Sequence, residues 1–228
     1  MTTAILTGTT GIRAPAVAGT WSTVSNCEDH QVWNDLRVCF IGDSFVAGVG
    51  DPQCLGWVGR LAAQTYANGQ PLTTYNLGVR MQTSTEILGR WQTECAPRFP
   101  DGSDARLVVS FGINDTTLIG GRTRVAPEQS AANLSELLTQ AAELPVLVVA
   151  PPPIDDTEQN ARTAALDEHF AEICAAAAVP YVRVHQPLRD SAVWMREVRA
   201  GDGAHPGAAG YDELAMLIHP YWREWLAR

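Results

Sequence analysis

Short apolar runs alternate with stretches of helical periodicity along most of the chain. Five of these runs have the length and the β-branched or aromatic content of strands that are buried on both faces. They cover residues 37–41, 72–77, 107–111, 146–150 and 181–184. Strands that alternate with helices in this way run parallel and are joined by right-handed crossovers, with helices on both faces of the sheet. The pattern therefore predicts an α/β fold around a five-stranded parallel sheet.

The segments between and after these runs have the features of helices. Thr83 and Glu86 have the spacing of a capping box, in which each side chain satisfies a free backbone N–H of the first turn. Pro127 suits a first helical turn, and Pro220 is expected to kink the last helix. The predicted helices cover residues 56–68, 83–95, 127–143 and 157–178, and a closing helix ends near residue 226.

Length and composition fit one folded domain with an extension. At 228 residues and 46% hydrophobic content, the chain is long enough for one substantial core and short for two. All the predicted strands and helices fall within residues 35–228, which we expect to form the domain. Residues 1–34 are rich in Thr, Gly, Ala and Ser and have no regular period, so we expect an N-terminal arm there, with no role assigned.

The charge of the chain narrows the class of partner. A formal net charge of −9, without any run of Lys or Arg, argues against nucleic acid and anionic membrane surfaces as partners. No segment approaches the ~20 consecutive apolar residues of a membrane-spanning helix, and the first residues lack the pattern of a secretion signal. A cytoplasmic protein is the expectation, and the oligomeric state is left open.

The cysteines and histidines indicate neither a disulfide framework nor a metal site. The five cysteines are odd in number and widely spaced, and no C-x-x-C pair occurs, so burial is their expected role. Metal-ligand spacing is absent from four of the histidines, His30, His169, His185 and His219. We therefore predict no metal and no cofactor.

The first apolar run leads to a serine at a tight turn. It is followed by Gly42-Asp43-Ser44, and Gly42 permits a sharp exit that exposes Ser44 at the carboxyl end of the strand. Serine also commonly caps the helix after a strand, so the position alone does not establish a nucleophile. A serine hydroxyl becomes a useful nucleophile only beside a base, with hydrogen-bond donors ready for the oxyanion.

Other parts of the chain supply these partners. The first three strands end at Ser44, Gly78 and Asn114, and the carboxyl ends of parallel strands share one rim of the sheet. The N–H groups of Ser44 and Gly78 and the amide of Asn114 are the donor types of an oxyanion hole. His205 supplies a base, and Asp202 is close enough in the chain to hold its imidazole ring. These residues form a candidate catalytic triad with an oxyanion hole.

Four blocks of the sequence together resemble the GDSL, or SGNH, serine hydrolases. The blocks are Gly42-Asp43-Ser44, Gly78, Gly112-Ile113-Asn114-Asp115 and Asp202-Gly203-Ala204-His205. The resemblance runs from about residue 37 to residue 226 and implies a flavodoxin-like, three-layer α/β/α sandwich. It also implies the site roles already described, and an activity on carboxylic esters, thioesters, lysophospholipids or sugar acetates that needs no metal.

One position departs from the family pattern. Relatives often carry a second glycine three positions after the first, where this chain has Met81. If the backbone at this position needs a positive φ, methionine is strained there and the loop after Gly78 differs in shape. Met81 then either lines the acyl pocket or has a plain packing role.

Further residues near the predicted rim have two interpretations each. Arg80 either holds a substrate carboxylate or phosphate or forms a salt bridge within the protein, and the salt bridge is preferred. Trp57 either lines the substrate pocket or packs in the core. Asp43 and Asp115 are interpreted as turn and capping residues rather than as acid–base carboxylates.

The leading interpretation is a serine esterase that forms an acyl-enzyme on Ser44. Short-chain acyl or acetyl esters of small molecules are the expected substrates. A thioesterase, a lysophospholipase or an acetyl-transferring enzyme would use the same residues, and these remain alternatives. A binding module that kept the fold and lost the chemistry is the alternative from another class, and the presence of every triad residue argues against it.

Overall fold

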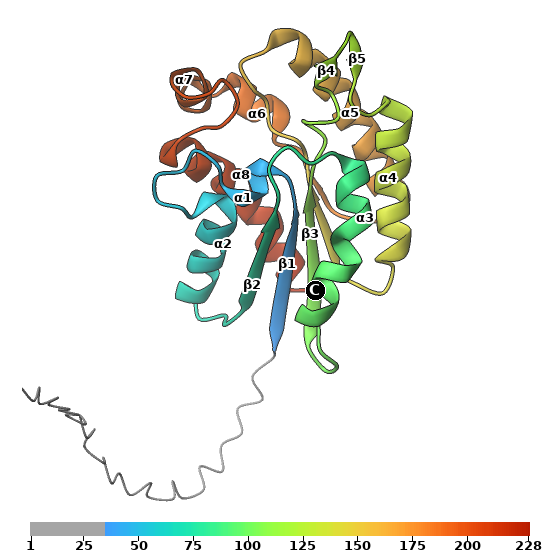
Figure 1. Ribbon diagram of the computed structural model, residues 1–228. Coiled ribbons are helices and arrows are strands. Elements are labelled where there is room, and N and C mark those ends of the chain that lie inside the picture. The colour runs from blue at the N-terminus through green and yellow to red at the C-terminus, as the bar shows by residue number, and fades with distance from the viewer. Residues whose placement is uncertain (1–34) are drawn as a thin grey trace, which may run out of the picture. The chain divides into compact units, whose positions relative to one another are not determined.

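The computed structural model describes residues 35–228, and within them the five predicted strands form one parallel sheet. The predicted arm, residues 1–34, lies outside the described residues. The strands are β1 (Leu36–Gly42), β2 (Thr73–Gly78), β3 (Asp104–Ser110), β6 (Val146–Val149) and β7 (Tyr181–Val182). They lie in the order β2-β1-β3-β6-β7, so the first strand lies inside the sheet and the strand order changes direction once (Figure 1). This is the flavodoxin-like order that the resemblance implied.

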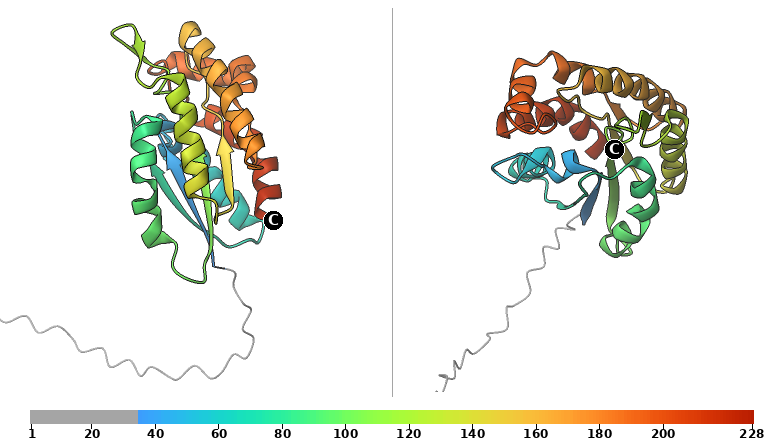
Figure 2. Two further views of the ribbon diagram at one scale, coloured as in Figure 1. Left: turned by 90° about the vertical axis from the view of Figure 1, so that its right-hand side faces the viewer. Right: turned by 45° about the horizontal axis from the view of Figure 1, so that its top comes forward.

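Helices cover both faces of the sheet and give the predicted three layers (Figures 1 and 2). One face carries α2 (Gly56–Ala67), α6 (His185–Asp190), α7 (Ala192–Ala200) and α8 (Ala208–Leu226). The other face carries α3 (Ser84–Cys95), α4 (Pro127–Gln140) and α5 (Thr157–Ala176). No helix among residues 35–228 has both the length and the apolar content needed to cross a membrane.

Alternate residues of β1 point into the two layers. Val38 and Phe40 belong to the core that faces α2 and α8, whereas Cys39 and Ile41 belong to the core that faces α3 and α4. A strand that is buried on both faces must be apolar at every position, which explains the continuous run in the sequence. This packing fixes the central strand, and with it the position of the residues that follow Gly42.

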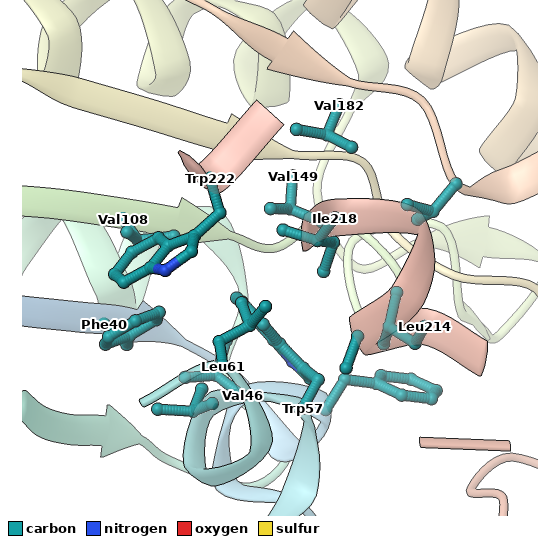
Figure 3. Packing of buried hydrophobic residues seen from close by; sticks show 14 of the residues in the cluster. Phe40, Val46, Trp57, Leu61, Val108, Val149, Val182, Leu214, Ile218 and Trp222 are labelled. Carbon is teal, nitrogen blue, oxygen red and sulfur yellow. The ribbon is translucent and has the colours of Figure 1, made fainter. Parts of the chain in front are cut away.

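Trp57 belongs to this core and does not line a substrate pocket. Its side chain is 1% exposed, and its ring meets the ring of Phe40 edge to face, with the centroids 5.5 Å apart (Figure 3). The ring of Trp222 from α8 lies at the same distance on Phe40. The expectation of a pocket wall at Trp57 is therefore wrong, because an amphipathic helix places its largest apolar side chain against the sheet.

The structure also contains elements that the sequence pattern did not predict. They are the short helix α1 (Ser44–Ala47), the 3₁₀ turn η1 (Ala96–Arg98), the hairpin of β4 (Leu118–Ile119) and β5 (Arg122–Thr123), and helices α6 and α7. All of these except α7 have six residues or fewer, which is too short to show a clear hydrophobic period. Cys54 is likewise exposed instead of buried, whereas Cys39, Cys95 and Cys174 are buried as expected.

Candidate active site

A tight turn after β1 positions Ser44. Gly42 is required there, because a Cβ atom would lie 2.1 Å from the carbonyl oxygen of Ser110 on β3. Asp43 is the N-cap of α1, since its carboxylate accepts the N–H of Phe45 at 3.0 Å. Ser44 is therefore the first residue of α1 and not its cap, which removes the main structural alternative to a nucleophile.

Ser44, His205 and Asp202 form a continuous chain of hydrogen bonds. His205 Nε2 lies 2.8 Å from Ser44 Oγ, although 161 residues separate the two in the sequence. His205 Nδ1 lies 2.8 Å from Asp202 Oδ2. The predicted nucleophile, base and carboxylate thus stand in the order that acyl transfer by a serine requires.

Asp202 is held in place by its own turn. Its Oδ1 accepts the backbone N–H groups of Ala204, at 2.9 Å, and of His205, at 2.8 Å, which leaves Oδ2 for the imidazole. Partial burial works to raise the pKa of Asp202, but the hydrogen bonds from His205 and Ala204 outweigh it and lower the pKa to about 2. The carboxylate is therefore ionised at neutral pH and keeps a proton on Nδ1.

The loop after α1 supports the other side of His205. Gly50 lies so close that a Cβ atom would be 2.6 Å from the carbonyl oxygen of Pro206. The ring of Phe45 lies 4.9 Å from the imidazole ring, measured between centroids. Arg60 from α2 binds the Asp51 carboxylate of this loop and also donates to the carbonyl oxygen of Ala208 at 3.1 Å. These contacts join the segment after Ser44 to the segment after His205.

The predicted oxyanion donors differ in whether their N–H groups already have an acceptor within the protein. The backbone N–H of Ser44, at the start of α1, donates no hydrogen bond to any group of residues 35–228. The Asn114 side-chain amide donates one N–H to the carbonyl oxygen of Gln82, and the distance between Nδ2 and this oxygen is 2.9 Å. Nδ2 also lies 3.5 Å from the Asp43 carboxylate, too far for a strong bond, so the second N–H is only weakly bound within the protein.

Gly78 does not present a free donor. Its N–H donates to Asn76 Oδ1 at 3.1 Å. A Cβ atom at Gly78 would lie 2.2 Å from the backbone nitrogen of Ala47, so glycine is needed there for the close approach of β2 to α1. The structure thus shows a packing role for Gly78, and the predicted oxyanion role would require its N–H to leave Asn76.

The positive φ considered for Met81 is present. Met81 has a φ of +67°, and Gln82 donates its N–H to the carbonyl oxygen of Val79 at 3.4 Å, which closes a turn over residues 79–82. A non-glycine residue in this conformation costs about 1–3 kcal/mol, so the surrounding contacts must hold the turn. The Met81 side chain is 64% exposed and has no packing role in the core.

Arg80 is exposed and forms no ion pair with any carboxylate of residues 35–228. The preferred salt bridge is therefore not formed in the described part of the chain. Asp43 and Asp115 do have the predicted capping roles, because Asp115 Oδ1 accepts the N–H of Ser84 at the start of α3, at 2.8 Å.

Asp43 should make the stability of the protein depend on pH. Burial, together with the nearby Asp115 charge, raises its pKa to about 7, although the hydrogen bond from the Phe45 N–H works to lower it. A folded-state pKa above the unfolded value favours folding most at low pH, and this contribution is lost as pH rises from about 4 to about 7. We therefore expect Asp43→Asn to gain a few kcal/mol of unfolding free energy relative to wild type over that range. Urea unfolding of both proteins at several pH values measures the difference, and a difference independent of pH would contradict this assignment.

Asn114→Ala should slow turnover and leave substrate binding nearly unchanged. Loss of one oxyanion donor typically lowers kcat by about 10²–10³-fold, because the donor acts on charge that develops only in the transition state. Steady-state kinetics on an ester substrate measures kcat and KM separately. Asn68→Ala, at an exposed position after α2, is the matched control. An equal loss in both variants, or a change in KM alone, would exclude Asn114 as an oxyanion donor.

A cavity of about 900 Å³ lies away from these residues, at the amino ends of the strands, between Arg106, Pro145, Pro180 and Trp225. A hollow of about 410 Å³ adjoins Asp202 and His205 and reaches Gly50 and Glu197. The chemistry, and not the cavity volume, therefore marks the candidate active site.

Comparison with known proteins places this site in a family. Residues 40–213, which include Ser44, Asn114, Asp202 and His205, match the GDSL-like Lipase/Acylhydrolase family. No curated protein matches the chain. Solved structures of similar fold include a lipase/acylhydrolase from Enterococcus faecalis, at 23% identity and a TM-score of 0.69, covering 82% of this chain and 94% of that one. Another is the acetylxylan esterase Axe2 from Geobacillus stearothermophilus, at 20% identity and a TM-score of 0.64, covering 85% of this chain and 96% of that one.

The two lines of comparison agree with the observed fold. The family match spans most of the chain and includes the segments after β1 and β3 and the turn before α8. The structural matches extend over nearly the whole of each known protein. The chain belongs to the GDSL-like lipase/acylhydrolase family of hydrolases.

Proposed function

We propose that this hydrolase is a serine esterase that cleaves small carboxylic esters through an acyl-enzyme on Ser44. The observation that carries the proposal is the continuous hydrogen bonding from Ser44 through His205 to Asp202, with 2.8 Å at both contacts of the imidazole. The ionised Asp202 keeps the proton on Nδ1, so Nε2 can accept the proton of the serine hydroxyl. Membership in the family supports a hydrolase, and the geometry supports serine as its nucleophile.

The reaction proceeds in two acyl transfers. Ser44 Oγ attacks the ester carbonyl carbon while His205 Nε2 takes the hydroxyl proton. The oxyanion that forms is stabilised by the N–H of Ser44 and by the weakly bound second N–H of Asn114. When the tetrahedral intermediate collapses, the C–O bond to the alcohol breaks and the alcohol leaves with the proton from His205. Water then repeats the sequence on the acyl-enzyme, releases the acid and restores the free serine.

Short acyl or acetyl esters are the proposed substrates. Arg80 and Met81 are exposed beside the site and do not enclose a deep pocket, so neither supplies the walls that a long acyl chain would need. An acetylxylan esterase and a lipase/acylhydrolase are among the proteins of similar fold, and both act on acyl groups by their names. Arg80 has no partner among residues 35–228 and is a candidate to bind an anionic substrate group.

A substrate panel tests the proposal. The full-length chain is assayed with p-nitrophenyl acetate, butyrate and octanoate, with an acyl-thioester and with an acetylated xylo-oligosaccharide. We expect turnover of the short esters that disappears in Ser44→Ala. A preference for the thioester would favour the thioesterase alternative, and absence of turnover across the panel would favour a binding module.

The domain organisation and the location are part of the same proposal. We propose that residues 35–228 form the complete hydrolase domain, that residues 1–34 are an arm outside it, and that the protein acts in the cytoplasm. A chain that starts at residue 35 should then keep the kcat of the full-length protein. A large loss of kcat with retained folding would show that the arm takes part in catalysis.

A further inference from the structure

The turn over residues 79–82 is held by hydrogen bonds to Gly42, Asn114 and Arg124, in three other parts of the fold. Val79 donates its N–H to the carbonyl oxygen of Gly42 at 3.0 Å, and Asn114 donates to the carbonyl oxygen of Gln82. Arg124, beside the β4–β5 hairpin, donates to the carbonyl oxygen of Met81 at 2.7 Å. The turn therefore supplies the acceptor that holds the Asn114 amide, and a shift in the turn would move that amide.

Arg90 from α3 joins this turn to the strand that ends at the serine. Its Nη2 donates to the carbonyl oxygen of Gly42 at 2.9 Å, and its Nε donates to the side-chain oxygen of Gln82. Its side chain is 14% exposed, and Nη1 pairs with Glu94 at 3.1 Å. One planar guanidinium thus binds the residue two positions before Ser44 and the residue whose carbonyl oxygen holds Asn114.

We propose that Arg90 is a positioning residue that fixes the Asn114 amide relative to Ser44, and so aligns the oxyanion donors. This inference rests on the proposed esterase function. A fork of N–H donors can bind Gly42 and Gln82 at once, whereas a lysine ammonium on a flexible stem cannot reproduce both directions. The strained Met81 gives the turn a tendency to relax, because the strain is retained only while the surrounding contacts hold it. Arg90 opposes that relaxation on the side that faces the serine.

The expected effect is on turnover and not on binding. Small misplacements of a group that acts in the transition state cost up to about 10²-fold in rate, so Arg90→Met should lower kcat by about 10–10²-fold and leave KM within about twofold. Arg90→Lys should recover only part of the loss. Gln82→Met, at a half-buried position, removes the same link without disturbing the contact to Gly42 and should show a smaller loss of the same kind.

A double-mutant cycle with Asn114→Ala separates positioning from a general structural role. If Arg90 acts through the Asn114 amide, Arg90→Met and Gln82→Met should each change kcat by less than about threefold once that amide is absent, since coupled residues are not additive. Arg98→Met is the matched control. Arg98 lies in η1, directly after α3, and contacts the carbonyl oxygen of Glu94 and the ring of Tyr75, away from the turn.

The assay uses p-nitrophenyl acetate, with wild type and Ser44→Ala measured in parallel. The inference about Arg90 is wrong, and the esterase function stands, if wild type is active and either of two results is found. In the first, Arg90→Met and Gln82→Met lower kcat equally with Asn114 present and with Asn114→Ala. In the second, their losses are no larger than that of Arg98→Met. If wild type shows no turnover that depends on Ser44, the function fails and the inference falls with it. Loss confined to the background that contains Asn114, with KM unchanged, supports the positioning role.

Discussion

Ser44→Ala is expected to lower kcat for ester hydrolysis by about 10⁶-fold, the largest effect of any single change in this chain. The alanine variant has no atom to attack the carbonyl carbon, and His205 loses the hydroxyl that lies 2.8 Å from its Nε2. Any residual rate would come from water held beside the oxyanion donors. The fold should survive, because Asp43, and not Ser44, caps α1.

Steady-state turnover of p-nitrophenyl acetate, followed down to the uncatalysed rate, measures this loss. Ser135→Ala, at an exposed position on α4, is the matched control and should keep the wild-type kcat. Circular dichroism of both variants checks that they fold. If folded Ser44→Ala kept more than a hundredth of the wild-type rate, Ser44 would not be the nucleophile.

Asp202→Asn is expected to lower kcat by about 10⁴-fold with little effect on KM. In wild type, Oδ1 accepts two backbone N–H groups, and Oδ2 accepts from the imidazole. The asparagine oxygen should keep the two backbone bonds, which places its NH₂ group against Nδ1. An NH₂ group can only donate there, so the proton of the ring moves to Nε2, which can then no longer accept from Ser44.

Asp156→Asn is the control for this substitution. Asp156 caps α5 by accepting the N–H of Gln159 at 2.8 Å, and asparagine caps helices equally well. The control variant should therefore keep both kcat and stability. Nearly native kcat in Asp202→Asn, or an equal loss in both variants, would show that the carboxylate does not orient His205.

The fold could be predicted because its central strands are buried on both faces. The sequence from Val38 to Ile41 is apolar at every position, and the structure places alternate residues in two separate cores. The capping box was also readable, because Thr83 and Glu86 are close in sequence and depend on local geometry alone. Ser44 and Asn114 follow the carboxyl ends of two parallel strands, so their location at one edge of the sheet could also be predicted.

The finer parts of the site depend on contacts that no local pattern encodes. The sequence offered Gly78 as a donor, but its N–H is bound by Asn76, and this partner is visible only once the turn is built. Arg90 lies on an ordinary amphipathic helix and has no motif of its own. Its contact with the carbonyl oxygen of Gly42 spans 48 residues and follows from packing α3 against β1.

Met81 shows how far a sequence departure can be interpreted. The family pattern identified a position where glycine is common, and the structure confirms a φ of +67° for the methionine there. The sequence could not tell whether the turn would change shape or retain it under strain. The hydrogen bonds from Arg124 and Asn114 to residues 81 and 82 supply the answer, because they hold the turn from outside.

The central claim is that Ser44 is the nucleophile of a triad with His205 and Asp202. Reaction of the full-length protein with a fluorophosphonate, followed by intact mass and peptide mapping, tests it most directly, since only an activated serine is phosphonylated at an appreciable rate. The account predicts one adduct per chain on the peptide that contains Ser44, and much slower labelling of His205→Ala. A folded wild-type protein that does not react, or an adduct on another residue, would contradict it.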